Sequence, residues 1–329
     1  MKIHVARTRV VLTYSLVDRW IDLLDRQDDT QRHVGTPDPG EADVIIYPDC
    51  HLLSRDWRLT EITESDTARR YPEKVAVYDE RDTPWCRYPG IYASMPAERI
   101  DPRWQVAGSY IFTEDPAGRI DGDPDALGRD LLFSFIGGRT HPCRDGILSL
   151  DPGRAHIESS RGFIFYEPTS DRFAERRRNF AEVMFRSNFV LCPRGQGTSS
   201  IRLYETLAAG RAPVIISDDW MPPAGPDWES FSIRWPEGRI GELPGALAER
   251  EADAAAMGRR AREAYDTWFA PTVVVTRQLD QLERLLRPGG FAGFPAGGGK
   301  DGQYRRARAA NVRFRYHSLR TKVADTVKR

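Results

Sequence analysis

"FVLCPRGQGTSSIRLYETLAAGRAPVII", residues 189–216, holds two apolar runs separated by a glycine-rich turn and an amphipathic segment. The first run has the composition of a buried strand and ends at Pro193, which cannot donate a hydrogen bond to a β ladder. Glycines permit the turn that follows, and a hydroxyl residue of 198–200 can cap a helix beginning near Ile201. A second strand, APVII, completes the stretch. This order of strand, turn, helix and strand is typical of a parallel α/β sheet.

The turn has the features of an anion-binding site. Backbone N–H groups at the start of a helix, together with the helix dipole, bind phosphate. Arg194 before the turn and Arg202 within the first helical turns can add bidentate bonds. Glu205, three residues after Arg202, lies on the same helix face, and a carboxylate there suits the hydroxyls of a ribose. An ordinary turn with a surface ion pair between Arg202 and Glu205 fits the same residues, so the pattern alone leaves both interpretations open.

The rest of the chain repeats the alternation of strands and helices. A polar, turn-rich seam at 115–130 separates two successive α/β units. Apolar runs and helical spacing predict the individual elements. Strands are expected at 2–8, 42–49, 74–82, 108–112, 130–138, 162–167 and 231–235, and helices over 15–26, 170–187 and most of 243–269.

The amino-acid composition argues against several classes of protein. The chain has 329 residues, enough for two lobes, and equal numbers of basic and acidic residues, 48 of each, so no global field attracts nucleic acid. Four scattered cysteines without a CxxC pair predict reduced thiols and neither a disulfide framework nor a zinc site. The sequence shows no leader peptide and no membrane-spanning run, and its composition resembles that of bacterial proteins, so we expect a cytoplasmic bacterial protein.

The C-terminal segment has a different charge balance. From Gly297 onward, ten Lys or Arg residues stand against two Asp. A peripheral contact with an anionic membrane surface and a solvated helix that packs back on the body both fit this basic tail.

A longer stretch, "FVLCPRGQGTSSIRLYETLAAGRAPVIISDDW" followed by "PDWESFSI", resembles the donor-binding signature of the exostosin family of glycosyltransferases. Upstream, "FSFIGGRTHPCRDGIL" resembles the other arginine-bearing strand-turn of that family, and the resemblance covers about residues 131–247. It implies an α/β fold of two Rossmann-like lobes that face each other across a cleft, the GT-B arrangement. The expected division is an acceptor lobe over 1–125, a donor lobe over 126–288, and a linker with a basic helical tail over 289–329.

The resemblance also implies an activity and a set of donor-binding residues. The family inverts the configuration of a sugar taken from a nucleotide-sugar, usually a UDP-sugar, without a metal or other cofactor. The acceptor would be a glycan or lipid-linked glycan in surface or secreted polysaccharide synthesis. A fucosyltransferase-like enzyme that uses a GDP-sugar and a non-catalytic sugar-nucleotide-binding partner stay as alternatives, in part because Gln196 stands where many members carry a basic residue. The family motif falls on Arg139, Arg144, Arg194, Gly195, Ser200, Arg202 and Glu205, and we expect the neighbouring Ser199 to bind the donor as well.

Such a reaction has two requirements. The negative charge that develops on the departing phosphate must be stabilised, and a base must remove the proton of the acceptor hydroxyl. Preorganised arginines, Arg139 among them, would supply the first. The base is expected in the N-terminal lobe, where "VYDERDTPW" places Asp79 and Asp82 at the carboxyl end of a strand. Turn bonds or ion pairs of these aspartates with Arg81 and Arg87 are the competing interpretation.

Overall fold

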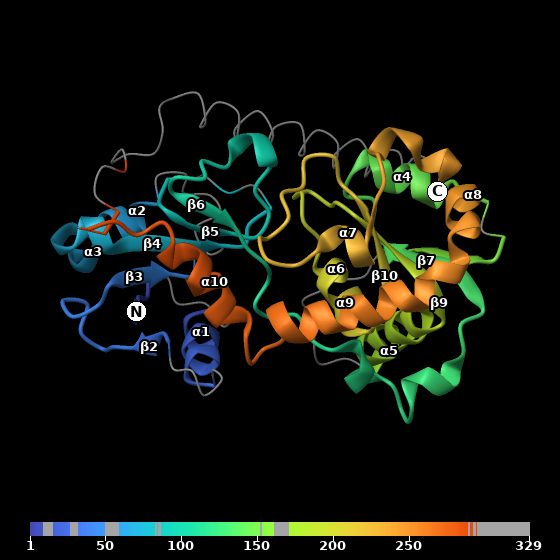
Figure 1. Cartoon of the computed structure of the whole chain (residues 1–329), viewed down its shortest axis with the longest axis horizontal. Coiled ribbons are helices and arrows are strands. Elements are labelled where there is room, and N and C mark those ends of the chain that lie inside the picture. The colour runs from blue at the N-terminus through green and yellow to red at the C-terminus, as the bar shows by residue number, and fades with distance from the viewer. Residues whose placement is uncertain are drawn as a thin grey trace. The chain divides into compact units, whose positions relative to one another are not determined.

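The computed structural model describes residues 1–8, 16–26, 32–49, 59–82, 84, 87–151, 153–160, 171–288, 290–291 and 294 (Figure 1). These residues form two compact units. The first comprises Met1–Phe112, Asp219–Pro226 and the segment that begins at Thr267, and the second comprises Thr113–Asp218 and Asp227–Asp266. The strand predicted at 162–167 and the basic tail lie outside the described residues.

The first unit is built on a six-stranded parallel sheet with the order β2-β1-β3-β4-β5-β6. Consecutive residues of its central strands point to opposite faces, and both sets are buried. Val44 and Ile46 pack with α1 and α10, whereas Ile45 and Tyr47 pack with the helices on the other face. The elements are β1 Lys2–Val5, α1 Leu16–Asp25, β2 Val34–Gly35, β3 Val44–Tyr47, α2 Thr60–Thr63, α3 Asp66–Arg70, β4 Val75–Asp79, β5 Gly90–Tyr92, β6 Gln105–Ala107 and α10 Val274–Glu283.

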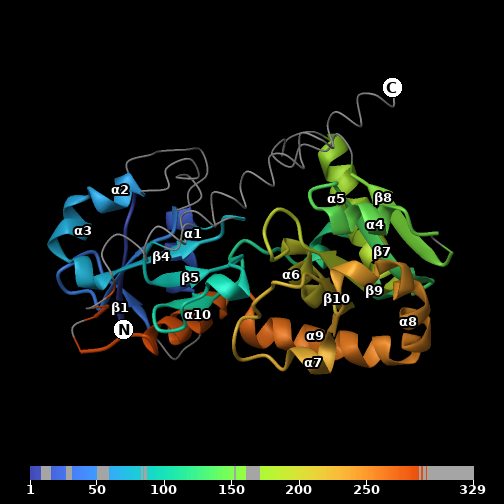
Figure 2. The same cartoon turned by 90° about the horizontal axis from the view of Figure 1, so that it is seen from above.

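The second unit has a five-stranded parallel sheet with the order β11-β10-β9-β7-β8 (Figure 2). Apolar side chains of β7, β9 and β10 on one face pack against α4, α8 and α9. Cys192, whose neighbour Leu191 belongs to that face, contacts Thr206 of α6 at 3.5 Å on the other. The elements are β7 Leu131–Gly137, α4 Pro142–Leu148, β8 Ala155–Ser159, α5 Asp171–Phe185, β9 Ser187–Pro193, α6 Ile201–Ala208, β10 Ala212–Ile216, α7 Trp228–Phe231, β11 Ile233–Arg234, α8 Leu243–Glu249 and α9 Ala254–Trp268. Two parallel sheets, each covered by helices, confirm the predicted pair of Rossmann-like lobes.

One predicted strand is wrong. Residues 108–112 form no strand; the strand nearby is β6, which ends at Ala107. The run is buried all the same, because the Ile111 N–H donates to Tyr78 Oη at 3.1 Å and its side chain joins the core. Burial without strand pairing therefore explains its apolar sequence. Strands β5 and β8 are not among the predicted elements.

The compact units divide the chain differently from the predicted lobes. The N-terminal segment of the first unit ends at Phe112 rather than near residue 125, and the unit takes in α10, which the prediction placed in the donor lobe. The physical reason is an apolar stripe on α10: Val275, Leu279 and Leu282 pack in the same cluster as Trp20. The predicted linker at 115–130 contains two short 3₁₀ helices, Pro116–Arg119 and Pro124–Leu127, and belongs to the second unit.

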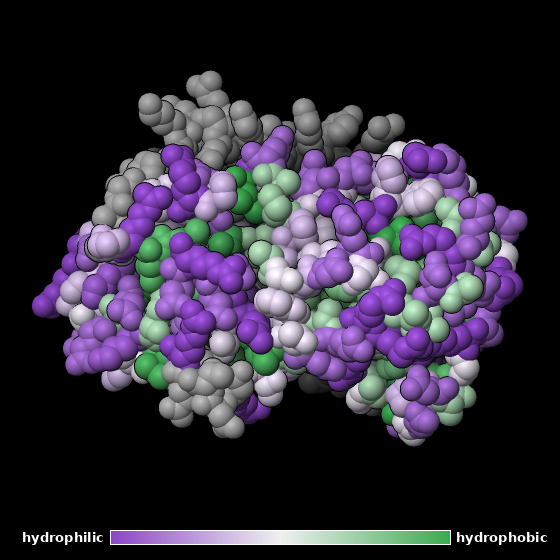
Figure 3. Space-filling model, in the orientation of Figure 1, coloured by the Kyte–Doolittle hydropathy of each residue, from purple (hydrophilic) through white to green (hydrophobic). Residues whose placement is uncertain are grey.

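Polar and charged residues cover most of the face shown in Figure 3, and hydrophobic residues show there only as small patches. Within the described residues, no helix has both the length and the apolar character needed to cross a membrane.

Candidate functional site

The second sheet has a topological switch point between β7 and β9. The chain leaves β7 for β8 on one side of it and later returns to β9 on the other side. Loops that follow the two strands therefore diverge, and ligands of parallel α/β sheets bind in the crevice at such a point, outside the carboxyl ends of the strands. The loop after β7 carries Arg139, and the turn after β9 carries Arg194 and Gly195. The structure thus brings both predicted arginine motifs to one end of one sheet.

Arg144 holds the turn that follows β9. Its guanidinium donates to three backbone carbonyls: Nε to Arg194 O at 2.8 Å, Nη2 to Pro193 O at 3.1 Å and Nη1 to Gly138 O at 3.2 Å. Gly195 packs closely here, because a Cβ at that position would lie 3.2 Å from Thr140 Oγ1 and 3.3 Å from Arg144 Nη2. Arg144, predicted as a donor-binding residue, therefore positions the loops after β7 and β9 relative to each other.

Arg202 extends from α6 toward the end of β7. It donates from Nη2 to the carbonyl of Ile136 and lies over two aromatic rings, those of Phe135 at 4.9 Å and Phe180 at 5.5 Å. Burial lowers the pKa of Arg202, yet a guanidinium keeps its charge across the physiological range. A fixed positive charge thus lies at the switch point.

The two remaining predicted arginines are ion-paired. Arg139 is 38% exposed and donates from Nη1 to Asp145 Oδ1 at 2.6 Å. Arg194 is 14% exposed, and its Nη1 lies 3.7 Å from Glu237 Oε1. The Arg139 pair is partly exposed and the Arg194 pair is long, and either feature weakens an ion pair, so an incoming phosphate can compete for these guanidinium groups.

The start of α6 supplies backbone donors. Ser200 is the N-cap residue, and its side chain makes no capping bond to the helix. The N–H groups of the first helical turn are thus not capped by that hydroxyl and suit an anion. Ser199 is buried beside this turn, 5% exposed.

Glu205 forms an ion pair that the sequence did not predict. Arg119, from the predicted linker, donates through Nη2 to Glu205 Oε1 at 3.1 Å, and both side chains are mostly buried, 15% and 13% exposed. Arg119 also lies 3.3 Å from Glu114 Oε2. Burial raises the pKa of Glu114, but the charges of Arg177 and Arg119 outweigh it and lower that pKa overall. No local sequence pattern marks Arg119, because its role depends on a segment 86 residues away.

The two predicted bases of the N-terminal unit have unlike environments. Asp79 ends β4, is 1% exposed, and accepts bonds from the Arg81 guanidinium on both carboxylate oxygens, one of them at 2.8 Å. This ion pair is the one that the competing interpretation expected for Asp79. Asp82 is exposed. Glu80 lies between these two aspartates in the sequence. Burial, and next the charge of Asp79, raise its pKa to about 8.

Residues 110–250 match the Exostosin GT47 domain family. A probable glycosyltransferase of Arabidopsis thaliana is 30% identical over 141 residues, which are 42% of this chain and 25% of the plant protein. The exostosin-1 homolog of Caenorhabditis elegans is 32% identical over 113 residues, 33% of this chain and 29% of the nematode protein. The chain thus spans less than a third of either relative.

Among solved structures, Anabaena Alr3699/HepE in complex with UDP and glucose has 10% sequence identity and a TM-score of 0.48, covering 86% of this chain and 100% of that one. The Rossmann-like fold of each unit is shown by the parallel strand order of its own sheet.

Proposed function

We propose, from the exostosin GT47 domain carried by residues 110–250, that this chain is an inverting glycosyltransferase which moves a sugar from a UDP-sugar to a glycan or lipid-linked glycan. The observation that supports it most is the cluster of guanidinium groups at the switch point between β7 and β9, beside the start of α6, where the Ser200 side chain makes no capping bond. This is the kind of surface that binds a diphosphate.

Each charged group has a role in the proposed reaction. Arg139 and Arg194 would exchange their carboxylate partners for the diphosphate, while Arg202 stays fixed beneath it. Glu205, held by Arg119, would accept hydrogen bonds from the ribose hydroxyls. Because these donors are positioned before the substrate arrives, they stabilise the negative charge that grows on the β-phosphate as the glycosidic bond breaks. We therefore propose that the diphosphate is held without a metal ion.

We further propose Glu80 as the residue that removes the proton of the acceptor hydroxyl. Asp79 is committed to Arg81, whereas Glu80 follows the carboxyl end of β4 and has a pKa of about 8. A base with a pKa near the working pH is efficient in proton transfer.

Isothermal titration with UDP and with GDP in the presence of EDTA tests the donor site. We expect UDP to bind, and Glu205→Gln and Arg119→Ala each to weaken UDP binding roughly tenfold, since a hydrogen bond to a charged group contributes about 1.5–3 kcal/mol. Glu229→Gln, which changes an exposed glutamate of α7 in the same unit, is the matched control and should bind as the wild type does.

The outcomes separate the alternatives. Tighter binding of GDP than of UDP would favour the fucosyltransferase-like enzyme. UDP binding without turnover, across a panel of donors and acceptors, would favour a non-catalytic partner. Unchanged affinity in both Glu205→Gln and Arg119→Ala would remove the assignment of this site.

A further inference from the structure

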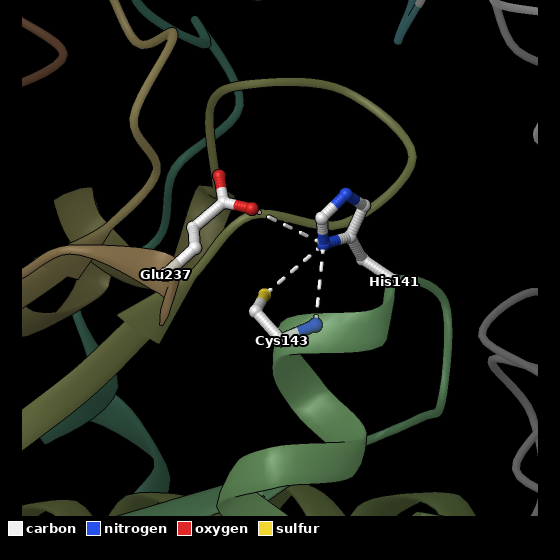
Figure 4. Close-up of side chains that lie close together, drawn as sticks. All are labelled: His141, Cys143 and Glu237. Carbon is white, nitrogen blue, oxygen red and sulfur yellow. Dashed lines mark hydrogen bonds and ion pairs between the residues drawn. The ribbon is translucent and has the colours of Figure 1, made fainter. Parts of the chain in front are cut away.

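Three side chains that can bind a transition metal meet beside α4. His141 is the N-cap residue of α4, Cys143 lies in its first turn, and Glu237 begins a 3₁₀ helix, Glu237–Glu242, that follows β11. Figure 4 shows all three side chains pointing toward one another from these two segments. Their ligand atoms lie within 4.8 Å of one another.

Two of the three distances between ligand atoms are close to those around one tetrahedral zinc ion. His141 Nδ1 lies 3.2 Å from Cys143 Sγ and 3.7 Å from Glu237 Oε2. Bonds of about 2.0 Å to nitrogen or oxygen and about 2.3 Å to sulfur place neighbouring tetrahedral ligands roughly 3.3–3.5 Å apart. Zinc would take the Nδ1 lone pair of His141, which now accepts a long capping bond from the Cys143 N–H at 3.4 Å.

The surroundings orient the carboxylate and leave space. Glu237 Oε1 accepts a hydrogen bond from the Asp218 N–H at 3.0 Å and is the oxygen nearest to Arg194, whereas Oε2 faces His141. Such outer contacts fix a ligand's orientation in metal sites. The cluster lines a hollow of about 440 Å³ together with Gly146, Gly238 and Ile240, which has room for a water molecule as fourth ligand.

A second cluster of metal-binding residue types, His33 with Asp280 and Glu283, differs in its charges. Arg32 pairs with both of its carboxylates, Asp280 at 3.2 Å and Glu283 at 2.6 Å, whereas Arg194 lies 3.7 Å from a single oxygen of Glu237 in the first cluster. The second cluster also has two carboxylates and no cysteine, whereas the first has the thiol of Cys143. Ligand softness therefore favours the cluster at α4 for zinc.

We propose that His141, Cys143 and Glu237 bind one Zn²⁺ ion, with water as the fourth ligand. Coordination forms a zinc–sulfur bond and releases the thiol proton to solvent. The ion would link the segment after β7 to the segment after β11, and so fix both against the sheet. The sequence predicted no zinc site, because His-x-Cys is a short motif and Glu237 lies 94 residues beyond Cys143. This site adjoins the diphosphate site proposed above, because Glu237 is also the ion-pair partner of Arg194.

Titration of metal-free protein with Co²⁺, followed by visible and near-ultraviolet absorption, tests the proposal without nucleotide. The starting protein has Cys50 and Cys86 replaced by serine, so that Cys143 and Cys192 are its only thiols. We expect one equivalent of Co²⁺ to produce tetrahedral d–d bands and a thiolate charge-transfer band, and Zn²⁺ to displace it. One equivalent of Zn²⁺ should also raise the Tm.

Single substitutions added to this starting protein test each proposed ligand. Cys143→Ser should remove the charge-transfer band, and His141→Ala and Glu237→Gln should each weaken Co²⁺ binding at least tenfold, while Cys192→Ser and His33→Gln leave it unchanged. Circular dichroism of each variant shows whether it is folded, and Glu237→Gln changes only a partly exposed side chain. A band that survives Cys143→Ser, one that disappears with His33→Gln, or the absence of any band would overturn the proposal.

Discussion

Four arginines near the proposed donor site have different environments. They are Arg139, Arg144, Arg194 and Arg202. Arg144 donates to three carbonyls and Arg202 lies over two aromatic rings, so both are parts of the framework. Arg139 pairs with a partly exposed carboxylate, and Arg194 lies 3.7 Å from the carboxylate of the mostly buried Glu237. The exchangeable pairs are the ones suited to binding and releasing a substrate, and the fixed ones hold the loops in place.

Glu80 makes the stability of the protein depend on pH. Burial, followed by the charge of Asp79, raises its pKa from 4.5 to about 8. The folded state therefore favours the protonated acid, so its contribution to stability is complete below pH 4.5 and is lost as the pH rises toward 8. We expect Glu80→Gln, which stays neutral, to gain stability over the wild type across this interval, by an amount on the order of a few kcal/mol.

Urea unfolding of both proteins between pH 4.5 and 9 measures this difference. Parallel pH profiles would show that Glu80 ionises as an ordinary glutamate. Turnover supplies a second readout: as the base, Glu80 should give wild-type activity that rises through pH 8, and Glu80→Gln should be inactive at every pH.

At the scale of elements, α9 crosses very close to the turn between α6 and β10. A Cβ on Gly258, in the middle of α9, would lie 2.3 Å from Gly210 O, which is closer than a carbon and a carbonyl oxygen can approach. Gly→Ala inside a helix normally gains up to about 1 kcal/mol, but here the helix would have to move away. We therefore expect Gly258→Ala to destabilise the protein by about 1–3 kcal/mol.

Gly245→Ala is the matched control, because Gly245 lies in α8 and a Cβ there would meet no atom within 4 Å. It should leave the Tm unchanged or raise it. Equal shifts of the Tm in the two variants would contradict the close crossing.

The sequence predicts elements well where local patterns decide them. β9, α6 and β10 follow from two apolar runs around a Pro-Arg-Gly turn, and each lies where it was expected. The short strands β5 and β8 have too few apolar residues to mark them, since β8 (AHIES) alternates only partly and pairs with β7 at the sheet edge.

The candidate site likewise combines residues that a local motif marks with residues that only the folded chain brings together. Arg194, Arg202 and Glu205 stand in one local motif and could be found from it. Arg119 could not, because its partner is distant in sequence, and neither could the role of Arg144, which depends on carbonyls that only the folded chain brings within reach.

At the scale of the whole molecule, the first unit depends on residues from near the end of the described chain. Leu279 of α10 is fully buried in the cluster formed with Ile3, Trp20 and Val44. We expect Leu279→Ala to cost about 2–5 kcal/mol, the usual range for a buried leucine. Hydrogen exchange should show faster exchange in β1 and β3, with β9 and β10 protected as in the wild type. Faster exchange confined to β9 and β10 would contradict this division into units.

The placement of α10 also sets an order for synthesis on the ribosome. The described part of the second unit has emerged once Asp266 has left the exit tunnel, whereas the first sheet still lacks α10, one of the two helices that cover one of its faces. We expect the later-made half to become protease-resistant first, reversing the usual sequence in which the N-terminal domain of a nascent chain folds before the next. Stalled chains of increasing length, treated with protease, would display that reversal, and until α10 appears the exposed apolar face of the first sheet is a natural target for a chaperone.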